Sequence, residues 1–157
     1  HWNWFDPEVL AWRVHLGLDA AFLAHLAEMR RAVEPAGAAL AARNRTADHL
    51  VALRSALAAM ARAGGDRRAF AEADRDFHIA VSAASGNPLF RSFAGVVEAA
   101  LEASFSLSSP DREGVAAIVA RHAAIADAIE AGDSGLAAGA MLAVIDEGLA
   151  RIAGEAE

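Results

Sequence analysis

The residues best suited to chemistry lie on helix faces that are otherwise apolar. At about 100° per residue, Phe70, Phe77 and Val81 share one face of a helix. Asp74 falls on that face and His78 lies at its edge, one turn later, so the two side chains can hold one hydrogen bond or one cation between them. A hydrogen bond between two core residues would explain this pair without any metal.

A second histidine occupies an apolar stripe farther along the chain. Ile118, Ile125 and Ile129 repeat at helical spacing, and His122 lies within their stripe. Two buried histidines and a buried aspartate match the ligands of an open zinc, nickel or manganese site, in which water or substrate completes the coordination. The sequence therefore predicts that His122 joins the earlier pair, either in a metal site or in a hydrogen-bonded core cluster.

An arginine occupies an apolar face in an earlier segment. Phe22, Leu26 and Val33 share a helix face that also carries Arg30. An unpaired guanidinium is costly to bury, so Arg30 needs an anionic partner. Glu34, one turn later, could be that partner, or Arg30 could bind the carboxylate of a small ligand through two parallel hydrogen bonds.

Caps and helix breakers divide the chain into the six or seven helices that must position these side chains. The expected helices cover about residues 7–15, 20–43, 47–63, 67–85, 89–105, 110–131 and 134–152. Asp19, Thr46 and Asp133 are expected N-caps, and Ser109-Pro110-Asp111 begins the sixth segment. No segment alternates as a half-buried strand would, and short connections favour antiparallel neighbours. The predicted fold is all-α, a single antiparallel bundle.

The composition fits one globular domain and excludes several classes of protein. The 157 residues are 55% hydrophobic and contain no cysteine, which removes disulfides, thiol chemistry and finger-type zinc sites. The net charge of -7 would repel a phosphate backbone, so this segment is not expected to bind DNA itself. Because no apolar run is long enough to cross a bilayer and no signal segment is found, we expect a cytoplasmic protein.

Two short motifs carry a family resemblance. Asp74-Arg75-Asp76-Phe77-His78 is followed by Ser85-Gly86-Asn87-Pro88-Leu89. This order, an Asp, two residues, Phe-His and then Ser-Gly-Asn, closely resembles the FCD effector-binding domain of GntR-family bacterial transcription regulators. The resemblance extends over nearly the whole chain, and residues 6–12 are similar to the branch that includes sugar-acid regulators.

The resemblance implies an all-α bundle with a central ligand cavity, a small organic acid as effector, a homodimer, and an N-terminal winged helix-turn-helix domain that binds operator DNA. We therefore expect residues 1–157 to be the ligand-sensing domain, with the DNA-binding domain absent from this chain. In metal-containing members the ligands are an Asp and three His, which correspond here to Asp74, His78 and His122, with Val144 at the fourth position. Valine cannot bind a metal, so the site either keeps three ligands or has lost its metal.

These expectations combine into a non-enzymatic sensor of a sugar acid or hydroxy acid. We expect Arg30, Asn87 and Arg121 to contact the effector and a divalent metal, zinc before nickel or manganese, to assist. Two alternatives remain: a metallohydrolase that activates water on the same ligands, and a purely structural dimerisation module. The sequence places no second acidic group on a buried stripe to act as a general base, which argues against the hydrolase.

Overall fold

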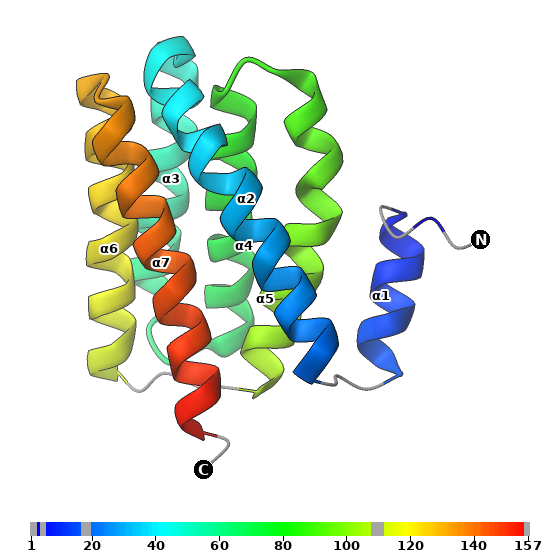
Figure 1. Ribbon diagram of the computed structural model, residues 1–157. Helices are drawn as coiled ribbons and strands as arrows, with labels where there is room; N and C mark the ends of the chain where they lie inside the picture. The colour runs from blue at the N-terminus through cyan, green and yellow to red at the C-terminus, as the bar shows by residue number, and fades with distance from the viewer. Residues whose placement is uncertain (1–2, 4–5, 17–19, 108–111, 156–157) are drawn as a thin grey trace.

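The computed structural model is a helical bundle, described for residues 3, 6–16, 20–107 and 112–155. Its elements are α1 (Pro7–His15), α2 (Ala20–Asn44), α3 (Ala47–Ala63), α4 (Arg67–Ala84), the 3-10 helix η1 (Pro88–Phe93), α5 (Ala94–Leu107), α6 (Arg112–Ala131) and α7 (Ser134–Glu155). Successive α-helices run in alternating directions (Figure 1). No strand occurs in these ranges, and the predicted all-α antiparallel bundle is confirmed.

Side chains that precede the first turn cap α1, α3 and α7. Asp6 accepts a hydrogen bond from the amide of Glu8, and Asp133 accepts one from that of Leu136. Thr46 and His49 cap α3 reciprocally, each side chain bonded to the other residue's amide. The expected cap Asp19 and the segment Ser109-Pro110-Asp111 lie outside the described residues.

The predicted helix over residues 89–105 is wrong at its start. The first part is the 3-10 helix η1, and the α-helix begins only at Ala94. Asn87 causes the tighter winding, because its side chain accepts from the amide of Leu89 and its carbonyl from that of Phe90, three residues on. Gly86, with φ of 72°, turns the chain out of α4 immediately before this segment.

Two apolar clusters hold the bundle together. The larger cluster lies among α2, α3, α4, α6 and α7, and it fully buries Phe77 and Ile125, as their stripes predicted. The smaller cluster joins α1, α2 and α5 around Leu10, Leu26 and Val96. Helix α1 stands at one side of the bundle and packs chiefly against α5 (Figure 1). The larger cluster therefore surrounds the predicted metal ligands, and the smaller one fixes α1.

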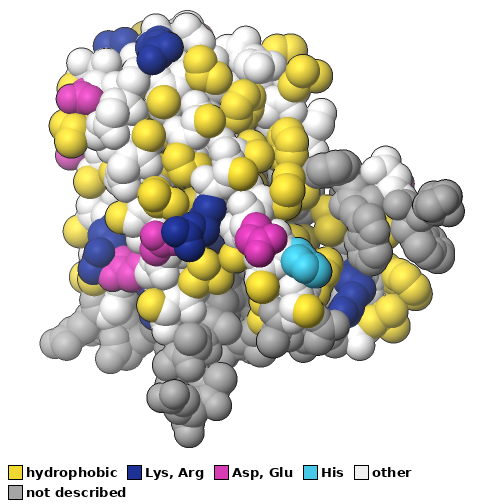
Figure 2. Space-filling view, in the orientation of Figure 1, with side chains coloured by type: hydrophobic (Ala, Val, Ile, Leu, Met, Phe, Trp, Pro, Cys, Tyr) yellow, Lys and Arg dark blue, Asp and Glu magenta, His cyan; other side chains and the backbone are white. Residues whose placement is uncertain are grey.

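The surface mixes apolar and charged side chains. On the face formed by α2 and α7, acidic and basic groups lie close together across the lower half of the view (Figure 2). One ion pair between these two helices joins Arg31 to Asp146. Within the residues described, no helix combines the length and hydropathy needed to span a membrane.

Candidate functional site

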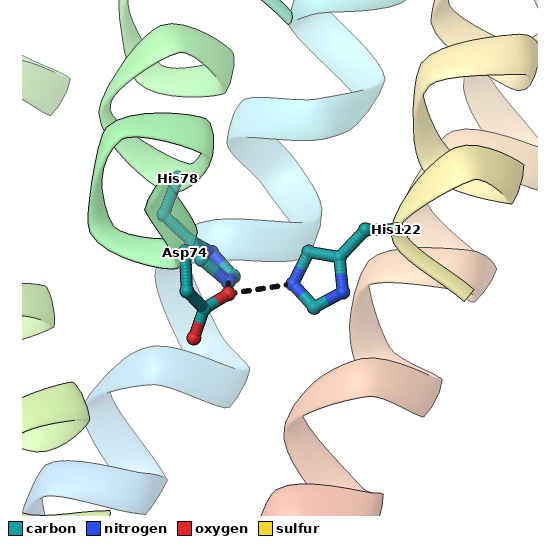
Figure 3. Close-up of side chains that lie close together, drawn as sticks. All are labelled: Asp74, His78 and His122. Atoms are coloured by element: carbon teal, nitrogen blue, oxygen red, sulfur yellow. Dashed lines mark ion pairs between the residues drawn. The ribbon is translucent and has the colours of Figure 1, made fainter. Parts of the chain in front are cut away.

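Three predicted metal ligands meet in the core of the bundle. Asp74 and His78 extend from α4, and His122 reaches toward them from α6 (Figure 3). His122 Nε2 lies 2.8 Å from Asp74 Oδ1, and His78 Nε2 lies 3.6 Å from the same oxygen. The three residues are at most 5% exposed. Helical spacing therefore correctly predicted which side chains converge.

The ring of His122 is oriented by the backbone of its own helix. Its Nδ1 lies 2.8 Å from the carbonyl oxygen of Ile118, and a carbonyl can only accept, so Nδ1 carries the proton of this hydrogen bond. In the neutral ring, Nε2 is then a bare lone pair facing the Asp74 carboxylate. Either a cation between the two groups or a proton on Nε2 would remove the resulting repulsion.

The Asp74 carboxylate is ionised despite its burial. Removal from water by itself raises its pKa, but the positive charge and close contact of His122, followed by the charges of His78 and Arg30, hold that pKa below its usual range when the rings are protonated. Within the described structure, Asp74 Oδ1, His122 Nε2 and both ring nitrogens of His78 have no hydrogen-bond partner of good geometry. One potential ligand atom from each of the three residues lies within 4.8 Å of the others, and in the neutral rings this nitrogen and carboxylate chemistry fits a zinc-type ion.

A second buried carboxylate adjoins these ligands. Glu34, from α2, is 7% exposed, and its Oε2 lies 2.5 Å from His78 Nδ1. Sequence reasoning considered Glu34 only as a partner for Arg30 and found no second buried acid, which was wrong. Its burial could have been predicted, because at 100° per residue Glu34 lies only about 40° from Arg30 on the same helix face.

Arg30 and Glu34 pair as the first of the two interpretations predicted. Arg30 Nε lies 2.5 Å from Glu34 Oε1, and Nη2 lies 3.4 Å from Oε2. Burial by itself would raise the pKa of Glu34, but the charges of Arg30 and His78 and their hydrogen bonds lower it to about 2. A chain of contacts therefore runs from Arg30 through Glu34 and His78 to Asp74.

Arg30 also lines two small cavities. One, of about 30 Å³, lies among α2, α5 and α7 beside Leu26 and Ile145. The other, of about 10 Å³, lies among α2, α4, η1 and α5, and Glu34 and Phe93 form part of its wall. Each has room for about one water molecule. Arg30 thus lines both cavities, whereas Asp74, His78 and His122 line neither of them.

The other predicted effector residues lie apart from the triad. Asn87 caps η1 through its side chain and carbonyl. Arg121 is 49% exposed and pairs with Glu147 of α7. Neither residue lines the two cavities beside Arg30, and their contact with an effector stays a prediction.

Val144 occupies the place where the resemblance puts a fourth metal ligand. It is partly buried and packs against the larger core cluster. A valine offers no lone pair, so a metal ion held by Asp74, His78 and His122 would have three protein ligands and would need an exogenous one to complete its coordination. This arrangement resembles the open geometry that metal sites use to bind small molecules.

Comparisons with known proteins place the chain in a family. Residues 25–147 match the FCD domain model. The chain is 32% identical over 152 residues to the galactonate operon transcriptional repressor of Escherichia coli K12, covering 96% of this chain and 66% of the repressor. The solved structure of E. coli McbR/YncC shares the fold, with a TM-score of 0.79 and 17% identity over 88% of this chain and 68% of that one. This chain therefore belongs to the FCD domain family of GntR-type transcription regulators.

Proposed function

We propose that this FCD domain senses a sugar acid or hydroxy acid and uses a zinc ion held by Asp74, His78 and His122. The observation that carries the proposal is the convergence of three buried lone-pair atoms without hydrogen-bond partners of good geometry. Such an arrangement is costly to bury unless a cation or a proton lies between the atoms, and two imidazoles with a carboxylate are ligands that suit zinc. The name of the galactonate repressor supports a sugar acid as the class of effector.

Each residue has a distinct part in this proposal. A bound zinc ion would act as a Lewis acid with a free position for an effector carboxylate or hydroxyl. Arg30 lines both cavities, but Glu34 balances most of its charge, so an anionic ligand would have to compete with Glu34 for the guanidinium. Asn87 and Arg121 stand farther out and would contact only a ligand that reaches the end of α4 or the α6–α7 surface.

Effector binding would have to move helices. A six-carbon acid is much larger than cavities of about 30 and 10 Å³, so α2 and α5 must separate to admit it. Phe93 and Val96 line the smaller cavity and also belong to the cluster that holds Leu10 of α1. Displacement of α5 would therefore move α1 as well. We propose that a DNA-binding domain precedes this segment, that α1 passes the movement to it, and that the regulator binds operator DNA as a homodimer.

The test is a thermal-unfolding panel on this chain. D-galactonate, other sugar acids and hydroxy acids are compared with neutral galactose, each with added zinc or with EDTA. A ligand at about 100 times its dissociation constant should add about 2.7 kcal/mol, which raises the melting temperature by roughly 5 to 10 °C for a chain of this size. We expect an acid-selective shift that EDTA removes.

Two variants separate the site from general stability effects. His122→Ala should abolish both the zinc shift and the acid shift, whereas His25→Ala, at an exposed position of α2, should preserve them. An acid shift that survives EDTA would exclude metal assistance and leave Arg30 as the anchor. Turnover of an acid derivative would indicate the metallohydrolase, and no shift with any acid in the panel would favour the structural dimerisation module.

A further inference from the structure

Both histidines of the triad have an oxygen atom close to Nδ1, but the two oxygens come from different groups. His122 donates to a backbone carbonyl of its own helix, whereas His78 Nδ1 faces a carboxylate from another helix, Glu34 of α2. In each case the anchored nitrogen leaves Nε2 facing the same oxygen of Asp74. Metal-binding histidines commonly depend on such a partner behind the ring, because it fixes both the tautomer and the ring orientation.

We propose that Glu34 is a positioning residue for the metal site, holding His78 in the Nδ1–H tautomer so that Nε2 is free to bind the ion. The inference rests on the proposed metal site and adds a residue from a third helix to it. At 2.5 Å, Glu34 Oε2 and His78 Nδ1 cannot both present lone pairs, so a proton lies between them, although the contact is bent away from ideal hydrogen-bond geometry.

Arg30 makes this use of a buried carboxylate possible. Its guanidinium contacts both oxygens of Glu34, so the carboxylate is ionised and can only accept a hydrogen bond from the Nδ1–H of His78. The pair is also nearly neutral in sum, so Glu34 adds little negative charge to that already supplied by Asp74. Glu34 is therefore placed to orient the ligand His78 rather than to coordinate the ion itself.

The experiment compares two double variants that both remove the buried charges. R30M/E34Q keeps a side-chain carbonyl that can accept from Nδ1–H, whereas R30M/E34L removes the acceptor. Neither leaves an unpaired buried charge, so both are expected to fold, which circular dichroism checks. R68M/E72Q removes an exposed pair of the same spacing from α4, the helix that carries His78, and serves as the matched control.

The first readout is the tautomer of His78 in metal-free protein, from long-range ¹H–¹⁵N NMR spectra at a pH where the ring is neutral. His78→Gln identifies the signal. We expect the Nδ1–H form in wild type, R30M/E34Q and the control, and a mixture or the Nε2–H form in R30M/E34L. An Nε2–H ring in wild type, or the same tautomer in R30M/E34L as in wild type, overturns the inference.

The second readout is zinc affinity by chelator competition. Loss of a partner behind a ligating histidine typically weakens metal binding by about 10- to 100-fold, so R30M/E34L should show that loss and R30M/E34Q should recover most of it. Equal affinities of the two variants overturn the positioning role. If wild type binds no zinc, the proposed metal site fails, while the tautomer spectra still decide whether Glu34 controls the His78 ring.

Discussion

Arg30 and Glu34 form an ion pair inside the bundle, one turn apart in α2, with Nε 2.5 Å from Oε1. Their side chains are only 10% and 6% exposed. Glu34 continues the contact to His78 of α4, so the pair links the helix that lines both cavities to the helix that carries two of the proposed metal ligands. A change at either residue therefore affects stability and the site together.

The first prediction concerns the stability of this pair. Glu34→Leu leaves the Arg30 guanidinium buried without its counter-charge, and the free energy of unfolding should fall by about 3 to 5 kcal/mol. R30M/E34L, which removes both charges, should be close to wild type or more stable. Urea unfolding in EDTA measures both.

Arg68 and Glu72 have the same spacing in α4 but are exposed, at 90% and 53%. Glu72→Leu should therefore change the free energy of unfolding by less than about 1 kcal/mol. A loss for Glu34→Leu no larger than the loss for Glu72→Leu would show that the buried pair is not needed for stability.

The Glu34 carboxylate should also make the stability of the fold sensitive to acid. Burial by itself raises the pKa of Glu34, but the charges and hydrogen bonds of Arg30 and His78 hold it at about 2 in the folded state, against 4.5 in the unfolded chain. Asp74 and His122 complete the group of titratable side chains at this site. A lowered folded-state pKa stabilises the fold above pH 4.5, and this contribution is lost as the pH falls toward 2. Metal-free wild type should lose stability over this window more steeply than R30M/E34Q, which retains only the Asp74 part. If the free energy of unfolding falls equally with pH in both proteins, the lowered pKa does not belong to Glu34.

Local signals in the sequence were sufficient for most of the fold. Thr46 and Asp133 bond the amides of their own first turns, and helical periodicity alone places Phe77 and Ile125 in the core. Both depend on residues a few positions apart, so the sequence contains what is needed to predict them. The convergence of His122 with α4 also followed, since an apolar face must turn toward the other apolar faces.

Contacts between helices could not be predicted in the same way. Whether Glu34 faces Arg30 alone or also His78 depends on how α2 lies against α4, which residue spacing within α2 does not determine. The position of the Arg121 side chain could not be predicted for the same reason. Arg121 pairs with Glu147 from α7, and this pair keeps the guanidinium of Arg121 at the surface. The 3-10 winding of η1 depends on how the Asn87 side chain folds back, for which a helical pattern gives no indication.

Two glycines should respond oppositely to alanine. Gly132 ends α6 with φ of 78°, and a methyl group there would lie 3.2 Å from the guanidinium of Arg45, which donates to the carbonyl of Glu130. Gly132→Ala should lower the free energy of unfolding by about 1 to 2 kcal/mol. Gly139 lies within α7, and a methyl group there would meet no other atom within 4 Å, so Gly139→Ala should add about 0.5 to 1 kcal/mol to the free energy of unfolding. Thermal unfolding of both variants tests this, and a stabilising Gly132→Ala would contradict the left-handed conformation.

The last prediction restores a fourth metal ligand. Val144 packs toward the core from α7, at the position where the family resemblance implies a fourth metal ligand, whereas its neighbour Ala143 is exposed. Val144→His should raise zinc affinity by roughly tenfold or more, because a fourth nitrogen replaces an exogenous ligand. In EDTA the same variant should be less stable than wild type, since the imidazole then lies in an apolar environment without a partner. Ala143→His controls for zinc binding by an added surface histidine and should change neither quantity. Chelator competition measures the zinc affinities, and urea unfolding measures the stabilities. If wild type and Val144→His bind zinc equally tightly, position 144 does not face the ion, and the correspondence to the four-ligand site fails.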